Sequence, residues 1–506
     1  MRSLARWGVL LVLCLFACGT DSFIKGVQAQ TFTVSGKITE PPAGTGTPIS
    51  GVDVLLVLNG NTQLTTQTDG SGNFSFSNIA AGSNYDVTPS KATFTFNPTS
   101  QGGSNIQANR TLFFTGTSSA SGSLQFSAAA TSVSETTPDL SVTVTRTGGT
   151  VTQATVEYST SDTAGTSLCS TVNGAASSRC DYLTTLGTLT FAPGETSKNI
   201  SIPIINDVFA EGNETFSITL SNASGATLGA TETETVTIND NDSSTGTANP
   251  IDDATFFVRQ HYLDFLNREP DTNGLNFWVN EITSCGSNTQ CRDIKRINVS
   301  AAFFLSIEFQ ETGYLVYRIS KTAFGNLTGK PVPVRFLSFL KDTQRIGQGV
   351  QVGVGNWQAQ LEANKQAYTL AIVQTPEFEA AFASSMTAQQ FVDKLNQNAG
   401  DVLSASENAN LVAVLGATPA DLNKRSQVLR AVAEDQTMKD AEFNRAFVLM
   451  QYFGYMRRNP DDTPDTDFSG YNFWLTKMNS FNGNYINAEM VKAFITSDEY
   501  RKRFGP

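Results

Sequence analysis

A short acidic stretch between two apolar runs places the strongest constraint on this chain. It extends from Ile205 to Phe216 and contains the carboxylates of Asp207, Glu211 and Glu214. The residues on either side alternate between apolar and polar, as in strands that bury one face. Two strands joined by so acidic a turn would suffer Coulomb repulsion unless a cation lies beside it. The sequence therefore predicts a β-domain with a cation site.

A second acidic turn, Ile238–Asp242, ends the next apolar run. Residues 121–245 contain thirteen acids and three bases, a net charge of −10, and the whole chain has a net charge of −12. One segment thus carries most of the imbalance. We expect its acidic turns to meet around calcium, which prefers clustered oxygen ligands. Nucleic-acid binding is disfavoured for so acidic a chain.

Short apolar runs in residues 121–245 are spaced by roughly ten residues, which indicates a β-sandwich. Five motifs occur there in the order of a known family: Val133-Ser134-Glu135, Asp181-Tyr182, Phe191-x-Pro-Gly-Glu195, Asp207-x3-Glu211-x2-Glu214-x-Phe216 and Asp240-Asn241-Asp242. Together they resemble Calx-beta domains, which are similar to calcium-binding modules of the sodium–calcium exchanger and integrin β4. The ligands that the resemblance implies are Glu135, Asp181, Asp207, Glu211, Glu214, Asp240 and Asp242.

Three positions depart from the strongest calcium binders of that family. Val208 removes one ligand oxygen, and Asn206 and Asn241 remove charge. Fewer charges predict weaker affinity, in the range of extracellular modules. An insertion, Thr166–Arg179, precedes Asp181 and could either brace or displace it. The alternative interpretation is that these acids are solvated turn residues without a metal.

Residues 31–116 also alternate like strands, and Asp69-Gly70 is a hairpin signal. The spaced patterns Gly-x-Pro-Ile-x-Gly-Val, Thr-x-Thr-Asp-x-x-Gly-x-Phe-x-Phe and Gly-x-x-Tyr-x-Val follow one another from Gly46 to Val87. They resemble the prealbumin-like (carboxypeptidase-regulatory or Cna-B-like) repeats of bacterial surface proteins. The resemblance implies a β-sandwich that acts as a spacer or a weak binding domain.

The N-terminus resembles an export signal. Arg2 and Arg6 precede the apolar run Gly8–Ala17, which is too short to span a bilayer. We expect residues 1–29 to be a signal peptide, with lipidation of Cys18 as the alternative. Export would place the protein outside the cell, at the cell surface or in the outer envelope.

Removal of such a signal leaves four cysteines, for which three pairings exist. Their closeness in sequence favours the disulfides Cys169–Cys180 and Cys285–Cys291, which an exported protein can form. With a single histidine in the chain, the cysteine spacing matches no zinc pattern.

Residues 251–506 change to a helical period and contain an internal repeat. Tyr262 and Arg268 recur 190 residues later as Tyr452 and Arg458. The pattern Tyr-x3-Leu-x-Arg-x-Pro-Asp, followed by Gly-x-x-Phe-Trp and Ser-x-Glu-Phe, resembles an all-helical bacterial family of unknown function, distantly like phycobilisome linker domains. We interpret His261 as a packed side chain, and the acids between Asp461 and Asp467 as turn and cap residues rather than a second calcium site.

The predicted fold class is multidomain, with two all-β sandwich domains followed by an all-α repeat domain. One histidine and oxidised cysteines leave little basis for catalysis. We therefore expect an exported, non-enzymatic surface or secreted protein that binds calcium and acts in adhesion or scaffolding, with a cell-surface protein or a glycan as its partner. The alternatives are a carbohydrate-binding accessory protein and a carboxylate-dependent hydrolase in the helical region.

Overall fold

The structure, a computed structural model, describes residues 30–118, 122–165, 167–244 and 246–506. The predicted signal peptide, including Cys18, lies outside these ranges. The chain divides into two compact units, Met1–Ala120 and Ser121–Pro506. Each unit is described by itself.

The first unit is a sandwich of two four-stranded sheets, ordered β4-β1-β8-β6 and β3-β2-β5-β7. Alternate residues of its strands, such as Val34, Phe74 and Val87, are buried between the sheets. Asp69 shapes the turn after β3 by accepting backbone hydrogen bonds from Ser71 and Asn73. The strands are β1 (Thr31–Thr39), β2 (Asp53–Leu58), β3 (Thr62–Gln67), β4 (Asn73–Ala80), β5 (Tyr85–Ser90), β6 (Phe94–Asn97), β7 (Gln101–Gly103) and β8 (Arg110–Ser118).

The second unit begins with another sandwich, whose sheets are ordered β10-β17-β15-β12-β13 and β14-β11-β9-β16. Tyr182 and Phe216 stack in its core with ring centroids 3.9 Å apart. The strands are β9 (Gly122–Phe126), β10 (Ala130–Ser134), β11 (Asp139–Thr147), β12 (Ala154–Thr160), β13 (Leu186–Phe191), β14 (Ser197–Pro203), β15 (Glu214–Ser224), β16 (Ala226–Leu228) and β17 (Thr233–Asn239).

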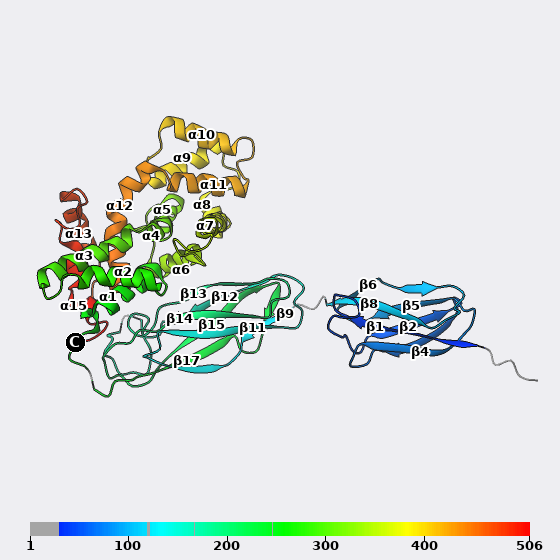
Figure 1. Cartoon of the computed structure of the whole chain (residues 1–506). Helices are drawn as coiled ribbons and strands as arrows, with labels where there is room; N and C mark the ends of the chain where they lie inside the picture. The colour runs from blue at the N-terminus through cyan, green and yellow to red at the C-terminus, as the bar shows by residue number, and fades with distance from the viewer. Residues whose placement is uncertain (1–29, 119–121, 166, 245) are drawn as a thin grey trace, which may run out of the picture. The chain divides into compact units, whose positions relative to one another are not determined.

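Helices form the rest of this unit, and the predicted fold class is thereby confirmed (Figure 1). Within the described residues, none of these helices is both long and apolar enough to cross a bilayer. The elements are η1 (Pro250–Asp252), α1 (Ala254–His261), η2 (Tyr262–Leu266), α2 (Thr272–Thr283), α3 (Thr289–Leu305), α4 (Ile307–Glu311), α5 (Gly313–Phe324), α6 (Phe336–Gly347), α7 (Trp357–Val373), α8 (Pro376–Ala381), α9 (Ala388–Ala399), α10 (Ala405–Leu415), α11 (Leu422–Ala433), α12 (Gln436–Gln451), η3 (Tyr452–Met456), α13 (Ser469–Ser480), α14 (Met490–Ile495) and α15 (Asp498–Arg501).

The internal repeat is visible in matching local structures. The π-helical turns η2 and η3 end in left-handed residues, Asn267 and Arg457, both with φ of 54°. The arginine that follows each of them binds a glutamate of a later helix, at 2.7 Å for Arg268 to Glu308 and 2.6 Å for Arg458 to Glu499. The sequence repeat therefore corresponds to a structural repeat.

The helical region covers an open edge of the second sandwich. Strand β13 ends its sheet, and α6 lies beside it (Figure 1). Gln344 accepts a hydrogen bond from the Leu186 N–H at 2.9 Å and donates to the Thr184 carbonyl at 2.7 Å. One helical turn later, Gln348 donates to the Thr188 carbonyl at 3.0 Å. These glutamines take the place of a neighbouring strand and leave less of the edge open to other chains.

Arg503 joins the sandwich to both helical repeats. Its guanidinium forms two 3.0 Å contacts with the Asp264 carboxylate, and both side chains are 1% exposed. It also donates to the Arg179 carbonyl of the sandwich at 2.7 Å and to the Tyr455 carbonyl of the second repeat at 3.0 Å. One buried charge is thereby compensated by partners from three parts of the unit.

Removal of this guanidinium should destabilise the second unit strongly. The change Arg503→Ala leaves Asp264 as a buried, unpaired carboxylate, which costs about 3–5 kcal/mol. The adjacent exposed pair of Lys502 with Asp498 supplies a matched control, so Lys502→Ala should change stability by less than about 0.5 kcal/mol. Urea denaturation measures both. Equal effects of the two substitutions would contradict this role of Arg503.

Candidate metal centre

Strand pairing explains why distant acids meet at one end of the second sandwich. Strands β10 and β17 run parallel, with Ser134 opposite Asn239, so both leave the sheet at the same end. Glu135 and Asp240 are the next residues along these strands. Strand β15 runs antiparallel to β17 and begins at this end with Glu214. Sheet topology therefore brings together three carboxylates that are far apart in sequence.

The remaining acids come from loops beside this end. Asp181 precedes Tyr182, which forms a bridge to Ile204, and the Asp181 carbonyl accepts from the Ile205 N–H at 2.9 Å. This pairing places Asp181 next to the acidic turn that contains Asp207 and Glu211.

The carboxylates form two groups that share one small cavity. Within each group, the candidate ligand oxygens all lie within 4.8 Å of one another. A cavity of about 10 Å³ has residues of both groups and Glu214 in its wall. The structure thus brings all seven predicted ligands to one end of the sandwich. The groups are Glu135, Asp240 and Asp242, and Asp181, Asp207 and Glu211.

Backbone hydrogen bonds hold these side chains in place. Glu135 accepts from the Asp207 N–H at 2.8 Å, which ties the first strand to the acidic turn. Asp240 accepts from the N–H groups of Glu211 and Gly212 at 3.0 and 2.7 Å. Each carboxylate has about four lone-pair positions, so these bonds leave oxygens for a further ligand.

The donor set fits a hard divalent cation. Asp207 and Asp242 each keep one buried carboxylate oxygen without a hydrogen-bond partner. Among the described residues, none of the seven acids forms an ion pair with lysine or arginine. Buried carboxylates without compensation are costly. Oxygen ligands alone favour calcium over softer metals.

Burial, together with the crowding of the acids, raises the pKa values of several of them. Burial, with Asp181 nearby, raises the pKa of Asp207 to about 10 and that of Glu211 to about 9. Burial raises the pKa of Glu135 and of Glu214 to about 7. Burial and Glu214 raise the pKa of Asp181, which shares a side-chain hydrogen bond with that residue. Without a cation, the centre retains protons at neutral pH.

The predicted insertion lies against this centre. Cys169 and Cys180 form a disulfide with Cα atoms 5.8 Å apart, and it packs against Phe209 of the acidic turn. Ala176 donates a backbone hydrogen bond to Thr215, next to Glu214, at 3.0 Å. Ser177 of the insertion donates a backbone hydrogen bond to the Asp181 carboxylate at 2.5 Å, so the described part of the insertion braces Asp181 rather than displacing it. Cys285 and Cys291 form the second disulfide.

The other candidate residues have structural partners. Asp461 binds Lys330 and Arg335, and Asp465 binds Arg458, so these acids are neutralised by bases. His261 is fully buried and contacts the Phe257 carbonyl and the Ser300 hydroxyl, both at 2.7 Å. Its burial lowers its pKa to about 4.

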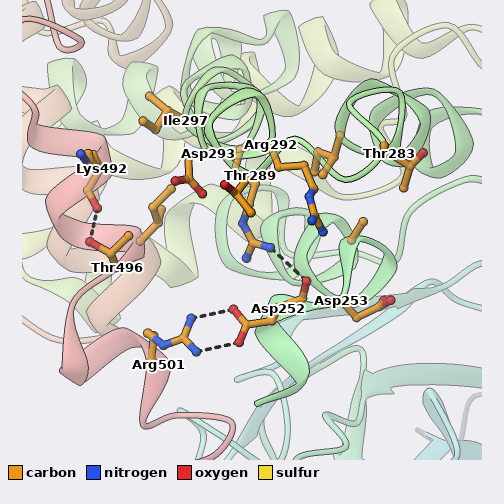
Figure 2. A pocket seen from close by; sticks show the side chains of 15 residues that line it. Asp252, Asp253, Thr283, Thr289, Arg292, Asp293, Ile297, Lys492, Thr496 and Arg501 are labelled. Carbon is orange, nitrogen blue, oxygen red and sulfur yellow. Dashed lines mark hydrogen bonds and ion pairs between the residues drawn. The ribbon is translucent and has the colours of Figure 1, made fainter. Parts of the chain in front are cut away.

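A second cavity, of about 500 Å³, lies among α2, α3 and the C-terminal helices (Figure 2). Arg501 holds Asp252 through two contacts of 2.8 Å, and Asp253 caps α1. Asp293 is the remaining carboxylate of this wall. Because two of the three acids are already engaged, this cavity offers no free carboxylate pair of the kind that glycoside hydrolysis uses.

Comparisons with known families agree with this geometry. Residues 118–242 match the Calx-beta domain, residues 29–113 match the second beta sandwich domain of the BOS complex subunit NOMO1-like family, and residues 244–312 match a domain of unknown function (DUF4214). The sandwich of the second unit therefore matches a Calx-beta domain. The N-terminal match is consistent with the predicted prealbumin-like sandwich.

Individual relatives are similar over short parts of the chain. Chitinase ChiA of Flavobacterium johnsoniae is 36% identical over 126 residues, which are 25% of this chain and 7% of that protein. The apo-form Calx CBD1 domain is 31% identical over 24% of this chain and 100% of that chain, with a TM-score of 0.22. The calcium binding domain CBD12 of CALX1.1 is 33% identical over 24% of this chain and 46% of that chain, with a TM-score of 0.20.

The pKa shifts predict an unusual pH dependence. A carboxyl group whose pKa rises on folding keeps a proton that the unfolded chain has released, so stability falls as pH rises from the unfolded pKa toward the folded one. For Asp207 and Glu211, this pH window extends from about 4, the pKa of a carboxyl group in the unfolded chain, to about 9–10, their pKa in the folded protein.

In EDTA, the melting temperature of the second unit should therefore fall between about pH 7 and pH 9, where His261 is neutral in the folded state and mostly neutral in the unfolded chain. Calcium should flatten this slope, because it binds the deprotonated carboxylates. Scanning calorimetry at pH 7 and pH 9 measures this fall in melting temperature. The variant Asp207→Asn should show a smaller fall, because it lacks one of the carboxyl groups with a raised pKa. A melting temperature in EDTA that does not fall with pH would contradict the account.

Proposed function

We propose that this chain is an exported, non-enzymatic surface or secreted protein that acts in adhesion or in scaffolding of the envelope or matrix. In this proposal its Calx-beta module binds calcium, which stiffens the unit formed by the sandwich and the helices. The observation that carries the proposal is the convergence at one end of the sandwich of seven acids that form no ion pair with a base in the part of the chain that the structure describes.

The ligands in the proposed centre are Glu135, Asp181, Asp207, Glu211, Glu214, Asp240 and Asp242. Calcium would supply the positive charge that offsets their repulsion there. The residues of this chain hold the carboxylates in place through backbone hydrogen bonds and bury Glu135, Asp181, Asp207 and Glu214. The loss of one ligand oxygen at Val208 supports an affinity in the submillimolar to millimolar range.

Export and the lack of catalysis have separate support. The N-terminal sequence is typical of a signal peptide, and the two disulfides suit an oxidising compartment. The single histidine of the chain is buried and engaged by its neighbours. The helical cavity lacks a free carboxylate pair among its wall residues.

Calcium should stabilise the second unit measurably. At a hundredfold excess over its dissociation constant, a ligand adds about 2.7 kcal/mol to the free energy of unfolding. Scanning calorimetry of the full chain in EDTA and in calcium should show one transition that moves upward with calcium.

The variant Glu135→Gln should lose most of this calcium-dependent shift, because it removes a ligand charge from the shared cavity. Glu232→Gln removes an exposed acid from the same sandwich and should keep the full shift. Equal shifts in both variants, or no shift in the parent chain, would refute calcium binding at this centre.

A further inference from the structure

A cleft between the Calx-beta sandwich and the helices is lined by residues that take no part in the proposed calcium site. It has a volume of about 600 Å³, within the usual range of small-ligand pockets, about 300–1,000 Å³. One wall comes from β12, β13 and β14, and the other from the segments around η2 and α6. A side pocket of about 220 Å³ adjoins it and shares Leu266, Arg268 and Glu308 with it.

The charges in these walls are already engaged. Arg268 holds Glu308 through two contacts of 2.7 and 2.8 Å and donates to the Glu269 carbonyl at 3.0 Å. Asp271, in the side pocket, caps α2 by accepting from the Gly274 N–H at 2.8 Å. An anionic ligand would therefore find no free base among these wall residues.

Some neutral polar groups in the walls, in contrast, have no hydrogen-bond partner among the described residues. The structure gives no hydrogen bond to the Tyr158 hydroxyl or to the Gln351 side chain, both half-buried. The Thr343 hydroxyl and the Asn267 carbonyl oxygen are buried and also unpartnered. Hydroxyls and amides offer both donors and acceptors, as sugar hydroxyls do. The Tyr158 hydroxyl and the Gln351 amide are the groups that a ligand in the cleft could pair with, because they are half-buried rather than sealed inside the protein.

An aromatic side chain lies in the side pocket. Trp278 is half-buried there, with Ile307 and Val352 as apolar neighbours in the same wall. Its large amphipathic ring can pack against the C–H face of a pyranose. The equivalent residue of the second repeat, Trp474, packs against Phe494 and is not a wall residue of either hollow.

We propose that this interdomain cleft binds a neutral oligosaccharide, with one sugar ring against Trp278 and the hydroxyls of the next residues paired with Gln351 and Tyr158. This activity goes beyond the proposed calcium-stabilised scaffold. It gives the surface protein a ligand that calcium binding alone does not provide. Acidic saccharides are excluded from the proposal, because Arg268, the base of these walls, is already paired with Glu308.

The test uses the full chain in calcium buffer. An array of neutral hexose and N-acetylhexosamine oligosaccharides, beside uronate and sialylated ones, should show binding to neutral glycans only. Calorimetric titration with the best neutral glycan then compares Trp278→Ala and Gln351→Ala with the parent. Each should weaken binding about tenfold or more, which corresponds to about 1.4 kcal/mol.

Trp474→Ala serves as the matched control and should leave affinity unchanged. Gln351 lies in a loop, so a thermal melt equal to that of the parent would show that its loss of binding is local. The proposal is overturned if neutral glycans do not bind, if acidic glycans bind better, or if Trp474→Ala weakens binding as much as Trp278→Ala.

Discussion

Repulsion among carboxylates buried at one end of the Calx-beta sandwich is the constraint on which the rest of this structure depends. The fold forces the acids together, because parallel pairing of β10 with β17 makes both strands end beside Glu135 and Asp240. Such a cluster is tolerable only when protons or a cation neutralise it. Burial and mutual repulsion raise the pKa values of Asp207 and Glu211, and a divalent cation would offset the same repulsion.

The same segments connect the centre to the helical region. Leu183 and Ile205, close in sequence to Asp181 and Asp207, are buried in one cluster with residues of the helices. The carbonyl of Arg179 accepts from Arg503 near the C-terminus. A change in the geometry of the acids must therefore be accommodated by the packing of the helices. An ordered acidic centre supports both the sandwich and the helical region.

Local pattern and family resemblance predicted the sandwiches, the helical repeat and the identity of the clustered acids. Alternation and acidic turns are local signals that the sequence shows directly. The parallel pairing of β10 with β17 is a long-range feature that the structure adds. The docking of the helices on the sandwich was not predictable. Its contacts, such as Gln344 with Leu186, join residues 158 positions apart, and polar glutamines on a helix have many ordinary roles. Gln344 and Gln348 share a helix face, but the sequence does not show which edge they cover.

A structure determined from crystals grown in calcium, with anomalous diffraction data, tests most directly the central claim that the clustered acids bind calcium. The account predicts an anomalous peak between the two acidic groups, with carboxylate oxygens about 2.3–2.6 Å from the ion. The hydrogen bond between Asp181 and Glu214 should then be broken, since both would be deprotonated. Absence of a peak, with that hydrogen bond retained at high calcium, would contradict the account.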